Sequence, residues 1–145
     1  GQSFGGYSTA ALLTGTRIFR AGIAFAGIYD LISVASTLQP GHPLITANWN
    51  LPAHPWADMG RYVENSPLHR ADRIRTPLLL IHGTDDQTCL IEEARKMFGA
   101  LRHLGRVVEL AEYNGEAHVP NHWGLANSSD AARRMLGFLD EFVRK

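Results

Sequence analysis

Three short segments rich in β-forming residues alternate along the chain with helical patterns, and this alternation limits the possible folds more than any other feature. Residues 21–28 (AGIAFAGI) and 77–82 (PLLLIH) are nearly continuous apolar runs, which are typical of strands buried on both faces. Residues 106–113 (RVVELAEY) alternate more, which favours a strand nearer the edge of a sheet. The alternation predicts an α/β fold with parallel strands and crossover helices.

Apolar residues recur at helical spacing in two of the remaining segments. Residues 90–104 place their apolar side chains on one face, and residues 130–143 repeat the pattern. We expect Ser128 or Ser129 to cap the second of these helices. Residues 5–15 (GGYSTAALLTG) are rich in small side chains and predict a third helix.

The segment between the first two predicted strands, residues 31–76, is irregular and holds five of the seven prolines. An irregular loop of this length inside a compact domain usually has a function. Trp49 and Trp56 lie in it, so a wall of a substrate site is one function to consider. Packing is the more frequent role of such aromatic side chains.

Size and charge exclude several classes of function. A chain of 145 residues has room for one compact domain. Fourteen basic residues balance fourteen acidic ones, so no electrostatic argument favours nucleic acid or an anionic membrane as a partner. The longest apolar run, near residues 21–28, is far shorter than the roughly 20 residues that a membrane span needs. The single cysteine, Cys89, excludes a disulfide within the chain.

The first residues form a G-x-S-x-G motif, Gly1-Gln2-Ser3-Phe4-Gly5. Where such a serine occupies a sharp turn between a strand and a helix, its hydroxyl projects above the sheet and can act as a nucleophile. We expect the glycines where neighbouring backbone passes too close for side chains. The N–H of Phe4 would then form half of an oxyanion hole. The pattern also occurs by chance in Gly- and Ser-rich loops, so it needs support from the rest of the chain.

The other members of a catalytic triad follow in the order that this fold requires, which is nucleophile, acid and histidine. Asp85 and Asp86 come directly after the predicted strand at 77–82, and His118 follows the strand at 106–113. Because the carboxyl ends of parallel strands share one edge of a sheet, we expect these side chains to meet there. His118 would act as general base and then as general acid, while the carboxylate orients its imidazole. Residue chemistry alone does not separate the two aspartates.

Two alternatives concern the histidine. His122 stands four residues after His118 and could replace it as the base, although it lies further from the strand end. The same pair has the i, i+4 spacing of a zinc site on a helix. Pro120 disfavours a continuous helix there, and the glutamate of an H-E-x-x-H motif is absent, so we expect no metal. We expect no cofactor either, because the chemistry is acid–base and nucleophilic.

Along nearly its whole length the chain resembles the catalytic domain of the prolyl oligopeptidase family of serine peptidases. The resemblance rests on GQSFGGY at residues 1–7, AGIYDL at 26–31, YVENSPLHRADRIRTPLLLIHGTDD at 62–86 and YNGEAH at 113–118. The segment from Ser-Pro-Leu to the His-Gly pair is the most specific of these. The resemblance implies the C-terminal part of an α/β-hydrolase fold that begins at the nucleophile turn, with the N-terminal strands missing.

The resemblance also assigns roles to residues. It makes Ser3 the nucleophile, His118 the base and Asp86 the acid, because the family's acid stands four places after the histidine of the His-Gly pair. Family members cleave peptides, and some cleave acyl or ester bonds. A valine often stands three places after the acid and helps to form the primary specificity pocket, where this chain has Cys89. We predict Cys89 and Tyr29 as substrate-binding residues.

Residues 1–145 are accordingly expected to be a partial catalytic domain. The strand that enters the nucleophile turn, the second oxyanion donor and the β-propeller that many relatives have would lie upstream. Because the edge of the strand at 21–28 would be exposed, we expect residues 1–145 alone to be poorly soluble and nearly inactive. The sequence leaves the cellular compartment open.

Three functional hypotheses follow. The leading one is a serine peptidase that cleaves a peptide or small ester substrate through an acyl-enzyme intermediate. The second is a carboxylesterase or lipase of the same fold, and the third is a non-catalytic binding protein that has kept the fold. The intact Ser3, Asp86 and His118 argue against the third hypothesis, because a binding role does not require all of them.

Overall fold

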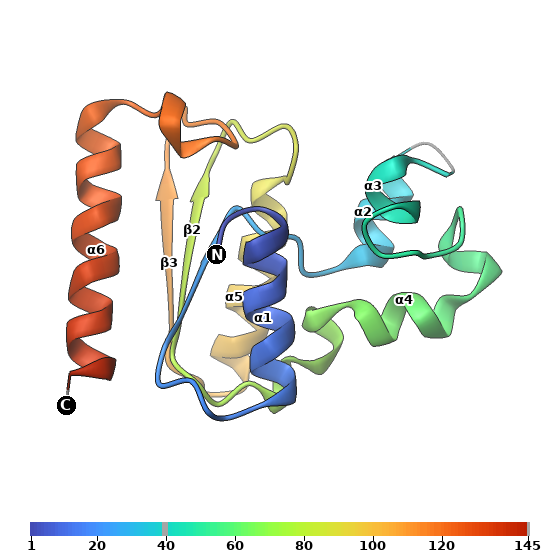
Figure 1. The fold of residues 1–145 in the computed structure, drawn as a ribbon, viewed down its shortest axis with the longest axis horizontal. Coiled ribbons are helices and arrows are strands. Elements are labelled where there is room, and N and C mark those ends of the chain that lie inside the picture. The colour runs from blue at the N-terminus through green and yellow to red at the C-terminus, as the bar shows by residue number, and fades with distance from the viewer. Residues whose placement is uncertain (39–40, 145) are drawn as a thin grey trace.

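The computed structural model describes residues 1–38 and 41–144. Within them lies a parallel sheet of three strands in the order β1 (Gly22–Phe25), β2 (Leu78–Gly83) and β3 (Val108–Tyr113), as Figure 1 shows. The predicted parallel α/β architecture is confirmed, with β2 in the centre and the more alternating β3 at an edge of this sheet.

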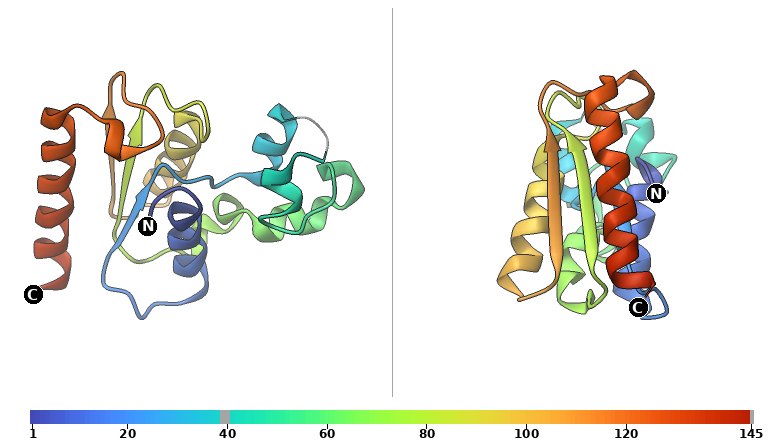
Figure 2. Two further views of the ribbon diagram at one scale, coloured as in Figure 1. Left: turned by 45° about the horizontal axis from the view of Figure 1, so that its top comes forward. Right: turned by 90° about the vertical axis from the view of Figure 1, so that its left-hand side faces the viewer.

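Helices cover both faces of the sheet (Figure 2). α1 (Phe4–Gly15) and α5 (Ile91–His103) pack on one face, and α6 (Leu125–Val143) packs on the other. The bounds of α1 and α5 agree with the predicted bounds to within one residue.

The central strand shows why its sequence is a continuous apolar run. Leu78 and Leu80 pack into the core with α1 and α5, whereas Leu79 and Ile81 pack into the core with α6. All four side chains are fully buried. Each such burial stabilises the fold by about 1.5–3 kcal/mol, so both faces of β2 must be apolar.

The start of α6 differs from the prediction. The helix begins at Leu125, before residue 130, and the prediction that Ser128 or Ser129 caps it is wrong. Gly124 is the N-cap residue, and its N–H donates to Glu116 Oε1 at 3.0 Å. The start of the helix is therefore fixed by a carboxylate of the preceding loop, which is a tertiary contact that a local cap pattern does not reveal.

The segment predicted to be irregular contains several short helices, so that prediction is wrong in this respect. Figure 1 shows them beside the sheet, on the side away from α6. They surround a small separate core that includes Tyr62, Ile45 and Leu51. The helices are α2 (Leu31–Thr37), α3 (Pro43–Thr46), α4 (Met59–Asn65) and the 3-10 helices η1 (Pro55–Ala57) and η2 (Pro67–Arg73).

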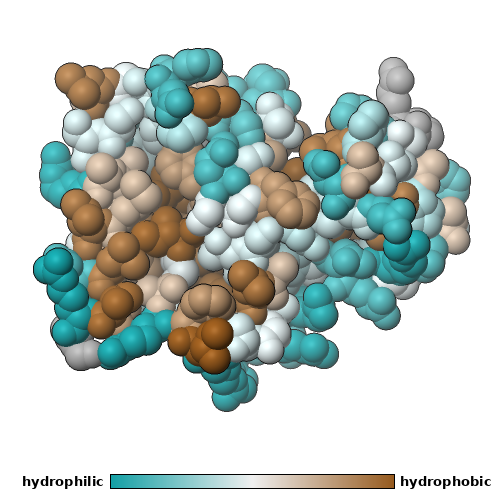
Figure 3. Space-filling view, viewed as in Figure 1, coloured by the Kyte–Doolittle hydropathy of each residue, from teal (hydrophilic) through white to brown (hydrophobic). Residues whose placement is uncertain are grey.

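An apolar groove of about 280 Å³ lies between α1, β1 and α6. Leu12, Phe19, Ile23 and Leu139 line it, and Figure 3 shows hydrophobic residues gathered on this part of the surface. Among the described helices, none is both long enough and apolar enough to span a bilayer.

Candidate active site

Ser3 occupies a tight turn between a segment paired with β1 and the start of α1. The N–H of Phe25 donates to Gly1 O, and the N–H of Ser3 donates to Phe25 O, both at 2.9 Å. Ser3 has φ 58° and ψ −118°, a left-handed backbone conformation that residues with a side chain rarely adopt. A strained serine between a strand and a helix is typical of a nucleophile turn.

Close backbone contacts explain two glycines beside Ser3. A Cβ at Gly1 would lie 2.4 Å from Gly5 O, and a Cβ at Gly6 would lie 2.7 Å from Phe25 O. Gly5 has open space at this position, so the expectation of crowding is wrong there. The approach at Gly1 lets the nucleophile turn close on the first turn of α1, and the approach at Gly6 lets α1 pack against the end of β1.

Ser3, His118 and Asp86 form a continuous chain of hydrogen bonds. His118 Nδ1 lies 2.7 Å from Asp86 Oδ2, and His118 Nε2 lies 2.9 Å from Ser3 Oγ. A carboxylate only accepts, so Nδ1 carries the proton and Nε2 is free to accept from the serine hydroxyl. The His118 side chain is 15% exposed and that of Asp86 is fully buried, so solvent reaches the imidazole but not the acid.

N–H groups surround both oxygens of the Asp86 carboxylate. Oδ1 accepts from the backbone N–H groups of Thr88 and Cys89, each at 2.8 Å, and Oδ2 lies 3.2 Å from His82 Nε2 in addition to its bond with His118. Burial alone would raise the pKa of Asp86, but the hydrogen bonds with His82, His118 and the two amides outweigh burial and hold it below its usual value. These contacts favour the ionised carboxylate.

Asp85, the other candidate acid, lies elsewhere. Its side chain accepts a hydrogen bond from Thr84 Oγ1 at 3.3 Å, and the residue is exposed. Its backbone N–H donates to Glu116 O at 3.0 Å. Of the two aspartates, the structure brings Asp86 to the imidazole.

The loop that carries His118 is fixed against the ends of two strands. A Cβ at Gly83, the last residue of β2, would lie 2.1 Å from Glu116 O, so only glycine allows this approach. The Gln2 side chain donates to His118 O at 3.2 Å and ties the loop to the nucleophile turn. His118 therefore reaches Ser3 from a loop held on both sides.

His122, the alternative base, lies on η3 (Pro120–His122) and is exposed. The structure does not bring it to the serine. In the part of the chain that is described, no three His, Cys, Asp or Glu side chains cluster in a way that could hold a metal ion.

The amide of Phe4 is placed at the start of a helix. α1 begins at Phe4, and the first N–H groups of a helix have no partner within that helix. The next amide, that of Gly5, donates to Gln2 O at 2.8 Å. The Phe4 N–H thus stays available beside Ser3, at the positive end of the helix dipole.

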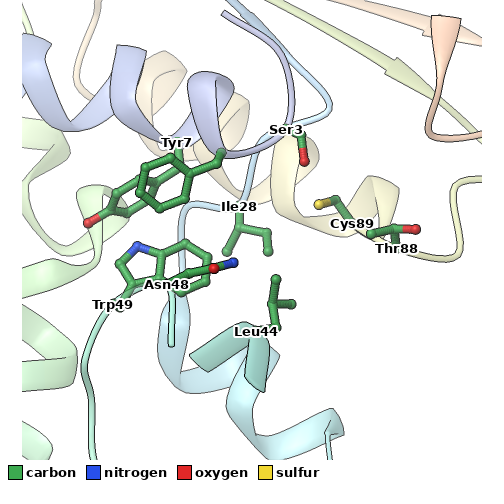
Figure 4. Close-up of a pocket in the computed structure, with 9 residues that line it drawn as sticks. Ser3, Tyr7, Ile28, Leu44, Asn48, Trp49, Thr88 and Cys89 are labelled. Atoms are coloured by element: carbon green, nitrogen blue, oxygen red, sulfur yellow. The ribbon is translucent and has the colours of Figure 1, made fainter. Parts of the chain in front are cut away.

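A cavity of about 40 Å³ opens next to Ser3. Figure 4 shows Ser3 and Cys89 on one side of it and Tyr7 and Trp49 on the other. The rings of Tyr7 and Trp49 meet edge to face at 5.1 Å between centroids. The remaining lining is apolar at Phe4, Ile28 and Leu44 and polar at Asn48 and Thr88.

The two predicted substrate-binding residues have different places. Cys89 lines the cavity, and burial, followed by the charges of Asp86 and Glu93, raises the pKa of its thiol to about 12. Tyr29 is fully buried in the core with α1 and α5, and it is not among the residues that line the cavity.

Sequence reasoning missed several residues of this region, among them Tyr7, Gln2 and His82. Tyr7 looked like an ordinary helix residue, Gln2 was treated only as a spacer in the motif, and His82 only as part of a His-Gly pair. The position of His82, four residues before Asp86, was the available signal for a contact between the two.

Comparison with known proteins assigns the family. The model of the prolyl oligopeptidase family matches residues 1–145. The chain belongs to the prolyl oligopeptidase family. Dipeptidyl-peptidase 5 of Porphyromonas endodontalis is 32% identical over 152 residues, which cover 100% of this chain and 21% of that protein.

Solved structures agree with this family. The acylaminoacyl peptidase of Pyrococcus horikoshii is similar with a TM-score of 0.88 at 26% identity, covering 100% of this chain and 24% of that one. A puromycin-hydrolyzing peptidase of Mycobacterium tuberculosis has a TM-score of 0.81 at 27% identity, covering 99% and 21%. These likenesses confirm the predicted α/β-hydrolase class. The chain spans 12% to 21% of the length of six curated relatives that it matches.

Proposed function

We propose that this chain carries the catalytic centre of a serine peptidase, with Ser3 as nucleophile, His118 as base and Asp86 as acid. The observation that carries the proposal is the hydrogen-bond chain from Ser3 Oγ through His118 to a fully buried carboxylate. Membership of the prolyl oligopeptidase family supports peptide hydrolysis as the reaction, since the similar proteins named above are peptidases.

In the proposed reaction, His118 Nε2 takes the hydroxyl proton while Ser3 Oγ attacks the carbonyl carbon of the scissile bond. The Asp86 carboxylate keeps Nδ1 protonated and stabilises the imidazolium. The imidazolium then gives its Nε2 proton to the leaving amine, and an acyl-enzyme remains on Ser3. Water activated by His118 hydrolyses this ester and restores the serine.

Phe4 is proposed as one donor to the oxyanion. Its backbone N–H belongs to the residue directly after the nucleophile. Because α1 starts at Phe4, no hydrogen bond within the helix uses this N–H. Negative charge that develops on the carbonyl oxygen is stabilised there by the N–H and by the helix dipole. The amide needs no rearrangement to act.

We propose that the cavity beside Ser3 receives a small apolar side chain of the substrate. Aromatic and aliphatic side chains form most of its wall beside the polar Asn48 and Thr88, and the Cys89 thiol stays protonated at neutral pH because burial raises its pKa to about 12. A protonated, buried cysteine behaves as a small hydrophobic residue. A charged substrate side chain would find no counter-charge in this wall.

We further propose that residues 1–145 are part of a larger catalytic domain and are poorly soluble and nearly inactive by themselves. The apolar groove between α1, β1 and α6 supports this, as do the exposed side chains of Ile18 and Leu12 beside it, which are 79% and 53% exposed. A monodisperse and active preparation of residues 1–145 would contradict this part of the proposal.

The test uses the full-length natural protein with a peptide amide and an ester that share the same acyl group. We expect cleavage of the amide, with loss of both activities in Ser3→Ala and full activity in the control Ser8→Ala. Cleavage of the ester without the amide would favour a carboxylesterase. No cleavage of either, together with no reaction with a fluorophosphonate, would favour a non-catalytic binding protein.

A further inference from the structure

A second histidine, His82, contacts the proposed catalytic acid and has no part in the reaction above. It belongs to β2 and is fully buried. Its Nε2 lies 2.6 Å from Cys89 O and 3.2 Å from Asp86 Oδ2. Its Nδ1 is buried without a hydrogen-bond partner among the described residues. A buried polar ring that is only half paired costs stability, so packing does not explain a histidine here.

The contacts of His82 fix its tautomer. The backbone carbonyl of Cys89 only accepts, so Nε2 carries the proton. A single N–H therefore faces both that carbonyl and the Asp86 carboxylate. The N–H of Cys89 in turn donates to Asp86 Oδ1 at 2.8 Å. Hydrogen bonds thus link Asp86, Cys89 and His82 to one another and fix their relative positions.

We propose that His82 is a positioning residue that joins the catalytic acid to the wall of the substrate cavity through this one N–H. The inference rests on the function proposed above, which gives Asp86 and Cys89 their roles. With the N–H in place, Oδ2 stays directed at His118 Nδ1 while the Cys89 side chain stays beside Ser3. Without it, only His118 directs Oδ2, and the carboxylate can tilt about Oδ1, which the N–H groups of Thr88 and Cys89 still hold.

The charged groups around His82 offer its N–H no better partner. Glu112 stands beside it in the register of β3. The Glu112 carboxylate is held by the Arg95 guanidinium, with N–O distances of 2.8 and 2.7 Å. Burial raises the pKa of the Cys89 thiol, so this group adds no charge at neutral pH. Asp86 is the acid that remains within reach of His82.

Two substitutions separate the N–H from the volume of the ring. His82→Gln keeps a side-chain N–H at a similar distance from the backbone, and His82→Met has similar length without a donor. His103→Gln and His103→Met, at the exposed end of α5, are the matched controls. The full-length natural protein carries each change, and the rate of reaction with a small fluorophosphonate is measured. This probe reports the activation of Ser3 without occupying the whole substrate cavity.

We expect His82→Met to react about 10-fold to 100-fold more slowly than the wild type, since a small misplacement of a catalytic group has an effect of this size. His82→Gln should stay within about 3-fold of the wild type, because it restores the donor. The His103 variants should react at the wild-type rate. Circular dichroism spectra establish that each variant is folded.

Wild-type reactivity of a folded His82→Met variant would overturn the inference. An equal loss in His82→Gln and His82→Met would also overturn it, because ring packing would then be the cause. If His82→Met does not fold, the rate of the folded His82→Gln variant decides the question. A rate near that of the wild type would support the inference, and a loss above about 10-fold would contradict it. A wild-type protein that does not react with the probe would overturn the proposed function itself.

Discussion

The two sides of the candidate site are held by different forces. On the side of the acid, Asp86 is fixed by hydrogen bonds of 2.7 to 2.8 Å from His118 and two backbone amides. On the side of the cavity wall, Trp49 contacts the rings of Phe4 and Tyr7 at 5.5 and 5.1 Å between centroids. Hydrogen bonds are directional, whereas ring contacts tolerate small shifts. From this comparison we expect the chemistry to depend on the strand ends, and selectivity to depend on the cavity wall that α1 and the segment between β1 and β2 form.

The largest effect is expected from removal of the nucleophile or the base, which breaks the hydrogen-bonded side completely. Ser3→Ala or His118→Ala should lower kcat of the full-length protein by about 10⁶-fold, and the double variant should be no worse than either. Steady-state peptide hydrolysis measures this. Additive losses would contradict a single catalytic unit.

Loss of the charge on the acid tests the same side more gently. Asp86→Asn should lower kcat by about 10⁴-fold, because the neutral amide no longer selects the imidazole tautomer that accepts the serine proton. The neighbouring change Asp85→Asn should stay within about 2-fold, as an exposed substitution. Comparable losses in both variants would contradict the assignment of Asp86.

Truncation of the cavity wall should act on binding and leave the chemistry intact. Trp49→Ala should lower kcat/KM for peptides with an apolar residue at the cleavage site by about 10-fold, since it removes apolar contact from the cavity. Its rate of reaction with a small fluorophosphonate should stay unchanged. Trp56→Ala, which changes a side chain that is 75% exposed, is the control. If Trp49→Ala also lost its reaction with the fluorophosphonate, the cavity wall would affect the chemistry as well as binding, which would contradict the distinction between the two sides.

The smallest effect concerns stability in acid. The pKa of Asp86 lies below its usual value of 3.8 in the folded protein, so its ionised form stabilises the fold above the pKa of the unfolded chain. That stabilisation is lost as the pH falls through the folded pKa. Between about pH 5 and about pH 2, the urea midpoint should therefore fall less in Asp86→Asn than in the wild type. Parallel curves would contradict the pKa shift.

Local pattern predicted the regular part of the fold well. The strands follow from apolar runs and α5 from helical spacing, because their side chains meet the core through their own periodicity, whereas α1 follows from its small side chains. The start of α6 was not predictable this way, since Glu116, eight residues before the N-cap in the preceding loop, fixes it. The short helices of residues 31–76 were also missed. The longest of them has seven residues, which is too few for an apolar pattern to stand out, and they pack around a core made from distant residues.

The order of the candidate catalytic residues along the chain was predictable, but their individual contacts were less so. The alternation of strands and helices indicated that a serine, an acid and a histidine meet at one edge of the sheet. The choice between Asp85 and Asp86 came from family resemblance, because the turn after β2 decides which carboxylate faces inward. The spacing of four residues between His82 and Asp86 was a signal for their contact, but the turn after β2 decides whether the two side chains meet.

The most direct test of the central claim is to map the residue that a fluorophosphonate modifies in the full-length natural protein. Peptide mass mapping identifies the adduct, and the Ser3→Ala variant serves as the blank. We expect one phosphonylated residue, Ser3, with the reaction slowed strongly in Asp86→Asn and not in Asp85→Asn. An adduct on another serine, or no adduct on Ser3, would contradict the account.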